Sequence, residues 1–324
     1  MTGKNRYAFF GGTIAPIDEA RISVMTSAFL YGTAVFEGLR AFWSDEREEL
    51  YVFRMREHFE RLLRGCRILR IEIPFDADGL SAATLDLLRT ESFREDAYIR
   101  PVAYKSDHKI GVRLDGIGSD FTMFAVPLGA YIDKPEGARL MVSSWRRVAD
   151  DAIPPRGKIN GAYVNSALAK SEARENGFDD ALMLTADGHV SEASAANLFL
   201  ARNGALHTPP SADEILEGIT RDAFIRLARD RGMEVIERRI DRSEVYAADE
   251  AFLCGTAVNI VPVTEVDRRT IGDGRPGPIT RRLRSLFERV VVGAEPEYRG
   301  WCSPVYRSRG DARTSAAFAP AVPA

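Results

Sequence analysis

Lysine is scarce in this chain, and one lysine lies where an amine could act as a nucleophile. The 44 basic side chains include only six lysines: Lys4, Lys105, Lys109, Lys134, Lys158 and Lys170. Lys158 follows the stretch 154–157, which holds two prolines and a glycine, and Tyr163 comes five residues later. Such a rigid approach can aim an amine into a crevice, where it could attack a carbonyl carbon. Taken alone, this context fits an exposed loop lysine better than a catalytic one.

Further segments could serve the same chemistry. Glu192 lies among small residues in VSEASAANLF, so a flat ring could approach the backbone while the carboxylate holds a protonated pyridine nitrogen. Thr220 opens a helix in LEGITR, where amides and a hydroxyl could bind phosphate, and the end of a strand at 255–257 could add more amides. Each feature has a simpler interpretation, as a surface acid, a helix cap or a strand end. Their joint appearance favours a phosphorylated ring cofactor.

Other chemistries find less support in the sequence. The segment GDGRPG at 272–277 matches the G-x-G-x-x-G pattern of dinucleotide sites, but it carries prolines and is followed only by a helix and a tail. We interpret it as a turn, and a nicotinamide dehydrogenase remains the alternative from another enzyme class. The four histidines have neither i, i+4 pairs nor clustered cysteines, so no metal site is predicted: His58, His108, His189 and His207. A G-x-S-x-G elbow is absent.

Composition restricts the class of partner. The 324 residues carry 47 acidic side chains, a net charge of −3 and 45 % hydrophobic residues, so we expect neither nucleic acid nor a membrane as partner. Three widely spaced cysteines, Cys66, Cys254 and Cys302, favour a reducing compartment. The first residues lack the apolar core of a signal peptide. We therefore expect a cytoplasmic protein.

The elements that must position these residues are mixed α and β. Periodicity predicts strands at 49–53, 98–104 and 121–126, and helices at 56–69 and 78–90. A helix is expected at 160–176, another at 221–231 with Thr220 as its cap, and a last one at 278–291. Strands are expected at 180–185, 197–201, 233–240, 250–254 and 260–266. Asp187-Gly188 and Asn203-Gly204 each predict a type I′ hairpin turn.

The predicted organisation is α/β of the α+β or mixed-sheet kind, without a strict βαβ series. We expect a small N-terminal domain at 1–130, a connection at 131–137, and a larger domain at 138–306 that holds the candidate cofactor residues. The stretch 307–324 is rich in small residues and proline and is expected to be a disordered tail.

Seven segments in chain order carry a resemblance to a known family. They are YGTAVFEGLR (31–40), REH (56–58), YIRP (98–101), GKINGAYVNS (157–166), VSEASAANLF (190–199), LEGITRD (216–222) and CGTAVNIVPV (254–263). Together they resemble the pyridoxal-phosphate aminotransferases of fold type IV, above all the branched-chain amino acid aminotransferases, over residues 6–302. The Tyr-x-Arg at 98–100 favours this group over relatives that act on D-amino acids.

The resemblance implies pyridoxal 5′-phosphate as cofactor and a role for each matching residue. Lys158 would bond covalently to the cofactor aldehyde and later move the proton between Cα and C4′. Glu192 would hold the pyridinium nitrogen, and Tyr163 would donate to the ring hydroxyl. The phosphate would be bound by four residues: Arg56, Ile219, Thr220 and Thr256.

The resemblance also implies the substrate residues. Tyr98 with the backbone of Thr256 and Ala257 would receive the α-carboxylate. A branched apolar side chain would lie against Phe36, Tyr31 and Tyr163. Arg100, with Tyr31 and Tyr131, would bind the second carboxylate of glutamate or 2-oxoglutarate. The expected reaction therefore exchanges the amino group of Leu, Ile or Val with 2-oxoglutarate, giving 2-oxo acids and glutamate.

Some features depart from the family pattern or leave alternatives open. The loop 107–112 is bulkier and more basic than the Gly-Met-Gly stretch of many relatives, which affects side-chain preference, while Ala193 and Ser194 replace glycine and alanine without expected harm. Family members are homodimers or larger, so a homo-oligomer is implied. A fold type IV enzyme acting on D-amino acids, (R)-amines or aminodeoxychorismate is the alternative function. A catalytically silent binding protein is the alternative outside enzymes.

Overall fold

The chain forms two compact units. The structure, a computed structural model, describes residues 6–129 and 134–307. One unit comprises the residues up to Gly129 together with those from Val291 onwards, and the other comprises Ala130–Val290. The first boundary lies next to the expected one at 130. Tyr131, part of the predicted connection and all but the first residue of the predicted tail lie outside the described residues.

The first unit contains the end of the chain as well as its beginning, which differs from the expected domain at 138–306. Strand β17 (Cys302–Pro304) pairs with β5 (Glu49–Phe53). The buried Glu49 carboxylate accepts hydrogen bonds from the backbone amides of Val305, Tyr306 and Arg307 at 3.1, 2.9 and 2.7 Å. A pairing across about 250 residues leaves no local signal in the sequence.

The sheet of the first unit has eight strands in the order β17-β5-β4-β6-β7-β1-β2, with β3 paired to β6, within the described ranges. Within the described residues, neighbouring strands of this sheet pair antiparallel. Its remaining strands are β1 (Tyr7–Phe10), β2 (Thr13–Pro16), β3 (Ala34–Phe36), β4 (Leu39–Ser44), β6 (Ala97–Lys105) and β7 (Ser119–Pro127). The unit also holds α1 (Ser27–Tyr31), α2 (Met55–Ile68), α3 (Ala77–Glu91) and two 3-10 turns, Ile17–Glu19 and Pro296–Trp301.

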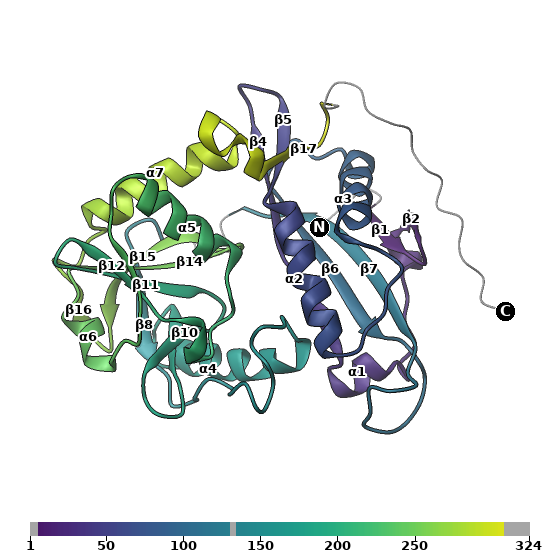
Figure 1. Ribbon diagram of the computed structural model, residues 1–324, viewed down its shortest axis with the longest axis horizontal. Helices are drawn as coiled ribbons and strands as arrows, with labels where there is room; N and C mark the ends of the chain where they lie inside the picture. The colour runs from purple at the N-terminus through teal and green to yellow at the C-terminus, as the bar shows by residue number, and fades with distance from the viewer. Residues whose placement is uncertain (1–5, 130–133, 308–324) are drawn as a thin grey trace. The chain divides into compact units, whose positions relative to one another are not determined.

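Helices α2 and α3 lie along this sheet (Figure 1). Met55, Phe59, Leu62 and Cys66 recur at helical spacing on the buried side of α2. On α3 the Thr84 hydroxyl contacts the Met123 sulfur of β7. Along β6, residues alternate between buried and half-buried, because successive side chains point to opposite faces. The half-buried face is the one that carries Tyr98 and Arg100.

The second unit has a mixed sheet. Its nine strands follow the order β10-β9-β8-β15-β14-β11-β12-β13, with β16 paired to β15, in the part of the chain that is described. The pairs β8/β9, β8/β15 and β12/β13 are parallel. The strands are β8 (Ala138–Val142), β9 (Asp180–Leu184), β10 (Val190–Ala193), β11 (Asn197–Arg202), β12 (Ala205–Thr208), β13 (Val235–Glu237), β14 (Glu250–Gly255), β15 (Asn259–Val266) and β16 (Arg269–Thr270). The helices are α4 (Tyr163–Glu175), α5 (Ile219–Asp230), α6 (Arg242–Tyr246) and α7 (Pro278–Val291), with 3-10 turns at Asn160–Ala162 and Ser211–Asp213.

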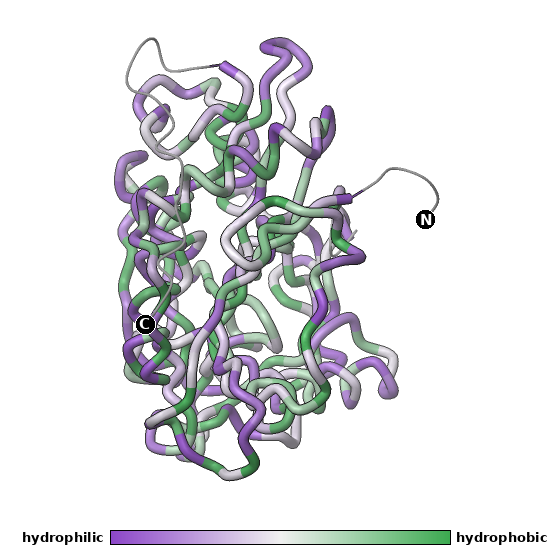
Figure 2. The backbone as a smooth tube through the Cα atoms, turned by 90° about the vertical axis from the view of Figure 1, so that its right-hand side faces the viewer, coloured by the Kyte–Doolittle hydropathy of each residue, from purple (hydrophilic) through white to green (hydrophobic). Residues whose placement is uncertain are grey.

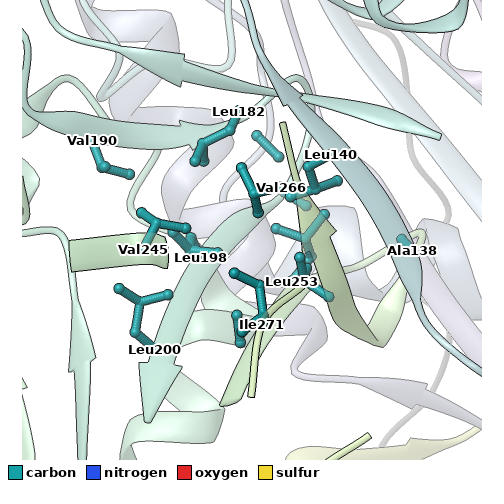
Figure 3. Packing of buried hydrophobic residues seen from close by; sticks show 14 of the residues in the cluster. Ala138, Leu140, Leu182, Val190, Leu198, Leu200, Val245, Leu253, Val266 and Ile271 are labelled. Atoms are coloured by element: carbon teal, nitrogen blue, oxygen red, sulfur yellow. The ribbon is translucent and has the colours of Figure 1, made fainter. Parts of the chain in front are cut away.

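Apolar side chains from most of these strands meet in one core. Figure 3 shows Leu182, Leu198, Leu253 and Val266 pointing toward one another within this cluster. Helices α5 and α7 pack elsewhere on the sheet, since Phe224 of α5 contacts Phe252 of β14 and Phe287 of α7. Helix α4 has a smaller apolar cluster of its own with β9. The predicted mixed-sheet α/β class is confirmed.

The two predicted hairpin turns have different outcomes. Asn203 and Gly204 have φ of 51° and 81° between the antiparallel strands β11 and β12, which confirms the Asn203-Gly204 turn. At 187–188 only Gly188 has positive φ, so the type I′ prediction is wrong there. The Thr185 hydroxyl bonds the Asp187 carboxylate at 2.6 Å and the His189 carbonyl at 3.1 Å, which holds a longer loop between β9 and β10.

The G-x-G-x-x-G segment at 272–277 is a turn before α7, and its helix N-terminus is already occupied. The buried carboxylate of Glu250 accepts hydrogen bonds from the amides of Ile279 and Thr280 at 3.0 and 2.9 Å, and from the Thr280 hydroxyl at 2.8 Å. An acidic side chain thus takes the place that a phosphate would need. This geometry argues against the dinucleotide alternative.

Several helices and strands begin or end at residues other than those predicted. Helix α4 starts at Tyr163 after a 3-10 turn, and α5 starts at Ile219 after Gly218, so Thr220 lies inside the first turn and is not the N-cap. The strand expected at 233–240 shortens to β13. Hydrophobic and hydrophilic segments alternate through the chain (Figure 2). Among the described residues, none of the helices combines the length and apolar character needed to cross a membrane.

Candidate active site

The amine of Lys158 meets the phenol of Tyr163. Lys158 Nζ donates a hydrogen bond to Tyr163 Oη at 2.6 Å, and both side chains are half-buried. Turn hydrogen bonds shape the approach: Gly157 N donates to Pro154 O at 3.2 Å and Ile159 N to Gly157 O at 2.9 Å. The turn then continues into α4, whose first residue is Tyr163. The turn thus brings the Lys158 amine to the Tyr163 phenol, a contact that the sequence analysis did not predict.

Glu192 is a buried carboxylate with three partners. Its side chain is 4 % exposed. Arg147 Nη2 lies 2.9 Å from Oε1, while Asn197 Nδ2 and the amide of Leu216 donate to Oε2 at 2.8 and 3.2 Å. The pairing of β10 with β9 shifts register between Val190 and Ala193. Such a bulge redirects side chains, and here it places Glu192 against these partners.

The N-terminus of α5 lies beside this carboxylate. Asn197, which holds Glu192, also donates through Nδ2 to Leu216 O at 3.0 Å. Gly218, the N-cap of α5, packs so closely on Asn197 that a β-carbon would collide with Oδ1 of this amide. Because glycine has no side chain, nothing from the N-cap residue covers the first amides of the helix. Ile219 and Thr220 are buried in this first turn.

The turn that carries Thr256 and Ala257 lies against the loop that follows Glu192. It joins β14 to β15, which pair up to Gly255 and Asn259. A β-carbon on Gly255 would lie 3.5 Å from Ala195 O and 3.7 Å from Ala196 Cα. Thr256 and Ala257 are half-buried. The second unit thus gathers three predicted features in one region: the acid, the helix N-terminus and this turn.

In the first unit, Arg100 is held between aromatic side chains. Its Nε and Nη2 donate to Tyr98 Oη at 3.1 and 2.7 Å, and its Cζ lies 4.4 Å from the centroid of the Phe36 ring. Phe36 is on β3, which pairs with β6. The structure therefore brings three predicted substrate residues together: Phe36, Tyr98 and Arg100.

Tyr31 contacts the loop that departs from the family pattern. The amide of Gly111 donates to Tyr31 Oη at 3.1 Å. Lys109 forms an ion pair with Asp107 at 2.8 Å and donates to Gly116 O at 3.0 Å. Ile110 and Val112 are 76 % and 86 % exposed. The loop thus exposes two apolar side chains, while the Gly111 amide between them is bonded to a predicted substrate residue. Tyr131 lies outside the described residues.

Arg56 is not placed as a phosphate ligand within its own unit. Its side chain is 57 % exposed, and it pairs with Glu60 at 3.1 Å and with Asp78. The buried arginine of α2 is Arg61, whose Nε and Nη2 bind the two oxygens of Glu37 at 2.6 and 2.8 Å. His58 Nδ1 lies 2.9 Å from the same carboxylate. The phosphate role of Arg56 gains no support from this geometry.

Sequence reasoning missed two arginines. Arg147 follows β8 in a stretch without periodicity, and nothing there marks it as the partner of Glu192. Arg61 gave a usable signal, since a charged residue on the apolar face of α2 must have a buried partner. Within the described ranges, no group of three His, Cys, Asp or Glu side chains could hold a metal ion.

Taken together, the second unit offers an amine beside a phenol, a fixed buried carboxylate and amides at a helix N-terminus. A lysine amine can condense with an aldehyde, and a fixed carboxylate can hold a protonated ring nitrogen. The comparisons agree with this chemistry. Residues 34–266 match the model of the family described as amino-transferase class IV.

The chain belongs to the class IV aminotransferases.

Similar members of the class IV aminotransferases are known by sequence. The chain is 47 % identical over 301 residues to the probable branched-chain-amino-acid aminotransferase of Aquifex aeolicus (strain VF5), covering 93 % of this chain and 97 % of that protein. It is 39 % identical over 308 residues to the branched-chain-amino-acid aminotransferase of Escherichia coli (strain K12), covering 94 % and 99 %.

Solved structures of class IV aminotransferases share the fold. A branched-chain aminotransferase from Thermoproteus uzoniensis, crystallised with norvaline, superimposes with a TM-score of 0.89 at 44 % identity, covering 93 % of this chain and 99 % of that chain. The branched-chain amino acid aminotransferase from Thermobaculum terrenum in its PLP-bound holo form gives 0.89 at 38 % identity, covering 94 % of this chain and 100 % of that chain.

Proposed function

We propose that this protein is a pyridoxal-phosphate-dependent aminotransferase that exchanges the amino group of Leu, Ile or Val with 2-oxoglutarate. The observation that carries the proposal is the Lys158–Tyr163 contact in the same unit as a fixed, buried Glu192. The names of the similar proteins, all branched-chain aminotransferases, support the substrate class.

The residues of the second unit fit pyridoxal 5′-phosphate. An amine is present for the aldehyde, a buried acid for the pyridine nitrogen, and a helix N-terminus without a side-chain cap from Gly218 for the phosphate. Small residues after Glu192 leave room for a flat ring. When bound, the cofactor supplies an electron sink for the charge that develops when a proton leaves the amino acid Cα.

The side chains of this chain would divide the work as follows. Lys158 would hold and transfer the proton at Cα, and the hydrogen bond to Tyr163 orients its amine for this step. Glu192 would keep the ring nitrogen protonated by presenting a fixed negative charge. Ile219, Thr220 and Thr256 would bind the phosphate with amides and hydroxyls, and Arg56 remains the predicted guanidinium ligand.

The first unit would supply the substrate side. Tyr98 would receive the α-carboxylate together with the backbone of Thr256 and Ala257. Phe36, Tyr31 and Tyr163 would contact the branched apolar side chain. Arg100, with Tyr31 and Tyr131, would bind the second carboxylate of 2-oxoglutarate. Because Arg100 stacks on Phe36, one pocket can present both an apolar surface and a guanidinium.

The test is spectroscopic. Purified protein should be yellow, borohydride should fix the cofactor to the wild type, and Lys158→Ala should form no such adduct. The bound cofactor is then mixed with separate L-amino acids, D-amino acids and amines. Bleaching by L-leucine, L-isoleucine and L-valine is expected. A colourless wild type that takes up no pyridoxal phosphate contradicts the proposal, and bleaching by D-alanine or an (R)-amine alone would replace its substrate class.

We also infer a cytoplasmic homodimer or larger homo-oligomer. The three cysteines are free and buried, which suits a reducing compartment. Around α1 the first unit exposes five large apolar side chains that a partner subunit would cover: Ile22, Val24, Met25, Phe29 and Leu30.

A further inference from the structure

The guanidinium of Arg147 forms an ion pair with the Glu192 carboxylate. Its side chain is 8 % exposed and its three nitrogens point to three different elements. Nη2 lies 2.9 Å from Glu192 Oε1 on β10, Nη1 donates to the Ser166 hydroxyl of α4 at 3.3 Å, and Nε donates to Glu214 O at 3.2 Å. A planar fork is suited to such a three-way contact.

Each of these contacts reaches a part of the cofactor region. Ser166 lies one helical turn after Tyr163, the partner of Lys158. Glu214 begins the segment that leads to the N-terminus of α5, and Leu216 in that segment donates to Glu192 as well. The backbone of Arg147 is fixed in turn, because its amide donates to Leu184 O of β9 at 2.8 Å.

A buried carboxylate without a cation is costly, and it would escape the cost by taking up a proton. Arg147 supplies the compensating charge on the side of Oε1, while Asn197 and the amide of Leu216 bind Oε2. The charges of Glu192 and of Arg221 on α5 both act on the thiol of Cys254 on β14. Burial raises the pKa of the Cys254 thiol, so this group stays neutral.

We propose that Arg147 is a positioning residue for the reaction, which keeps Glu192 ionised and fixed toward the ring nitrogen of the cofactor and ties it to α4 and to the segment before α5. This inference rests on the proposed function. It assigns to Arg147 two separable effects, one due to its charge and one due to its fork. The charge keeps Glu192 negative, so that the ring nitrogen of the bound cofactor keeps its proton, and the fork fixes the geometry of Glu192.

The experiment titrates the cofactor-free protein with pyridoxal phosphate and follows the visible band against pH. Arg147→Met should weaken cofactor binding about tenfold or more, as loss of the outer partner of a ligand does at metal sites. It should also raise the pH midpoint of the visible band by about one unit, because the nitrogen that joins Lys158 to the cofactor loses the positive charges of Arg147 and of the protonated ring nitrogen nearby. Arg147→Lys should keep the midpoint near that of the wild type yet still weaken binding, since one ammonium group cannot reach three acceptors.

Two further variants separate this role from a merely structural one. Arg147→Met leaves Glu192 unpaired and will lower the melting temperature, whereas Arg147→Met with Glu192→Gln should recover part of it without recovering cofactor binding. Arg238→Met removes a different arginine–carboxylate pair of this unit, the bidentate pair with Glu244. It should leave the midpoint unchanged.

The outcomes are distinct. A folded Arg147→Met protein with unchanged affinity and midpoint overturns the inference, and so does an equal midpoint shift in Arg238→Met. If Arg147→Met does not fold, Arg147→Lys and the double variant carry the test, and wild-type affinity in either overturns it. Wild-type protein that takes up no pyridoxal phosphate would end the proposed function and this inference together, whereas normal uptake by the wild type and by Arg147→Met alike ends only the inference.

Discussion

Arg100 is held in place by aromatic side chains, and its proposed role in binding 2-oxoglutarate can be measured by substitution. It donates twice to Tyr98 Oη and stacks on Phe36. Leucine has no second carboxylate, so the guanidinium should matter more for 2-oxoglutarate. Arg100→Ala is expected to raise KM for 2-oxoglutarate about tenfold or more beyond any change in KM for leucine, which steady-state kinetics with each substrate varied will show.

The matched control is Arg100→Lys, which keeps the charge and loses the bidentate fork. It should lie between the wild type and Arg100→Ala for 2-oxoglutarate. Equal effects of Arg100→Ala on both substrates would mean that the guanidinium does not read the second carboxylate.

Gly218 is the residue where the backbone of α5 approaches the amide that holds Glu192. A β-carbon there would collide with Asn197 Oδ1. Gly218→Ala should therefore push Asn197 aside, cost about 1–3 kcal/mol in the free energy of unfolding, and weaken binding of pyridoxal phosphate. Denaturant titration and cofactor titration measure the two effects.

Gly300→Ala is the control for this substitution, because nothing lies within 4 Å of a β-carbon built at Gly300. It should change neither quantity. If Gly218→Ala binds the cofactor as tightly as Gly300→Ala, the close approach is not needed for the site.

At the scale of elements, the N-terminus of α7 depends on one buried acid. Glu250 accepts three hydrogen bonds from Ile279 and Thr280. Glu250→Ala leaves those amides without this acceptor, so we expect a loss of about 1–3 kcal/mol in the free energy of unfolding, with KM for leucine unchanged. Urea denaturation measures the loss. Glu265→Ala breaks an ion pair with the half-exposed Arg139 and should cost under about 1 kcal/mol, and equal losses would contradict the capping role.

Elements were predictable where the sequence pattern is local. Helix α2, strand β5 and the Asn203-Gly204 turn depend on spacing or on φ preference within a few residues, and the structure has them where expected. Strand β17 pairs with a strand about 250 residues away. The strand predicted at 233–240 is limited to Val235–Glu237, the residues that pair with β12. Pairing over such distances is decided by tertiary contacts, which propensity does not encode.

The candidate site shows the same division. Lys158 and Tyr163 were both chosen from one local motif, and the structure joins them by a hydrogen bond. A buried acid needs a compensating charge, but only the fold shows that Arg147, among the many arginines of the chain, supplies it at Glu192. Arg56 was chosen from a motif, whereas the burial of Arg61 depends on Glu37 and His58. Glu37 lies between β3 and β4, outside the helix that carries both His58 and Arg61.

For the whole molecule, acid should weaken the fold through its paired carboxylates. Burial alone would raise the pKa of Glu37, but Arg61 and His58 hold that pKa far below its usual range. Hydrogen bonds from Arg238 lower the pKa of Glu244 to about 2. A carboxyl whose pKa is depressed on folding stabilises the protein above its unfolded pKa, and this stability is lost as the pH falls through the folded value.

Melting temperature should therefore fall between about pH 4.5 and pH 2, where the unfolded chain takes up protons that the folded one resists. Glu244→Gln should be less stable than the wild type at pH 7 and should lose less on acidification. Melting curves from pH 7 to pH 2 measure both slopes. If the melting temperature falls equally with pH in Glu244→Gln and in the wild type, the Arg238–Glu244 pair does not contribute to the loss of stability in acid.

Assembly is the last property that the whole molecule must satisfy. Phe29 is 67 % exposed on a helix of only five residues, with Leu30, Val24 and Met25 beside it in the sequence. An apolar group of this kind is stable in water when another protein surface covers it.

Sedimentation should give at least twice 35.9 kDa for the wild type and a shift toward the monomer for Phe29→Asp. Ile68→Asp, at an apolar residue of α2 that is 36 % exposed in the same unit, should leave the mass unchanged. A wild type that sediments as a monomer, or equal dissociation by both variants, would refute α1 as the contact between subunits.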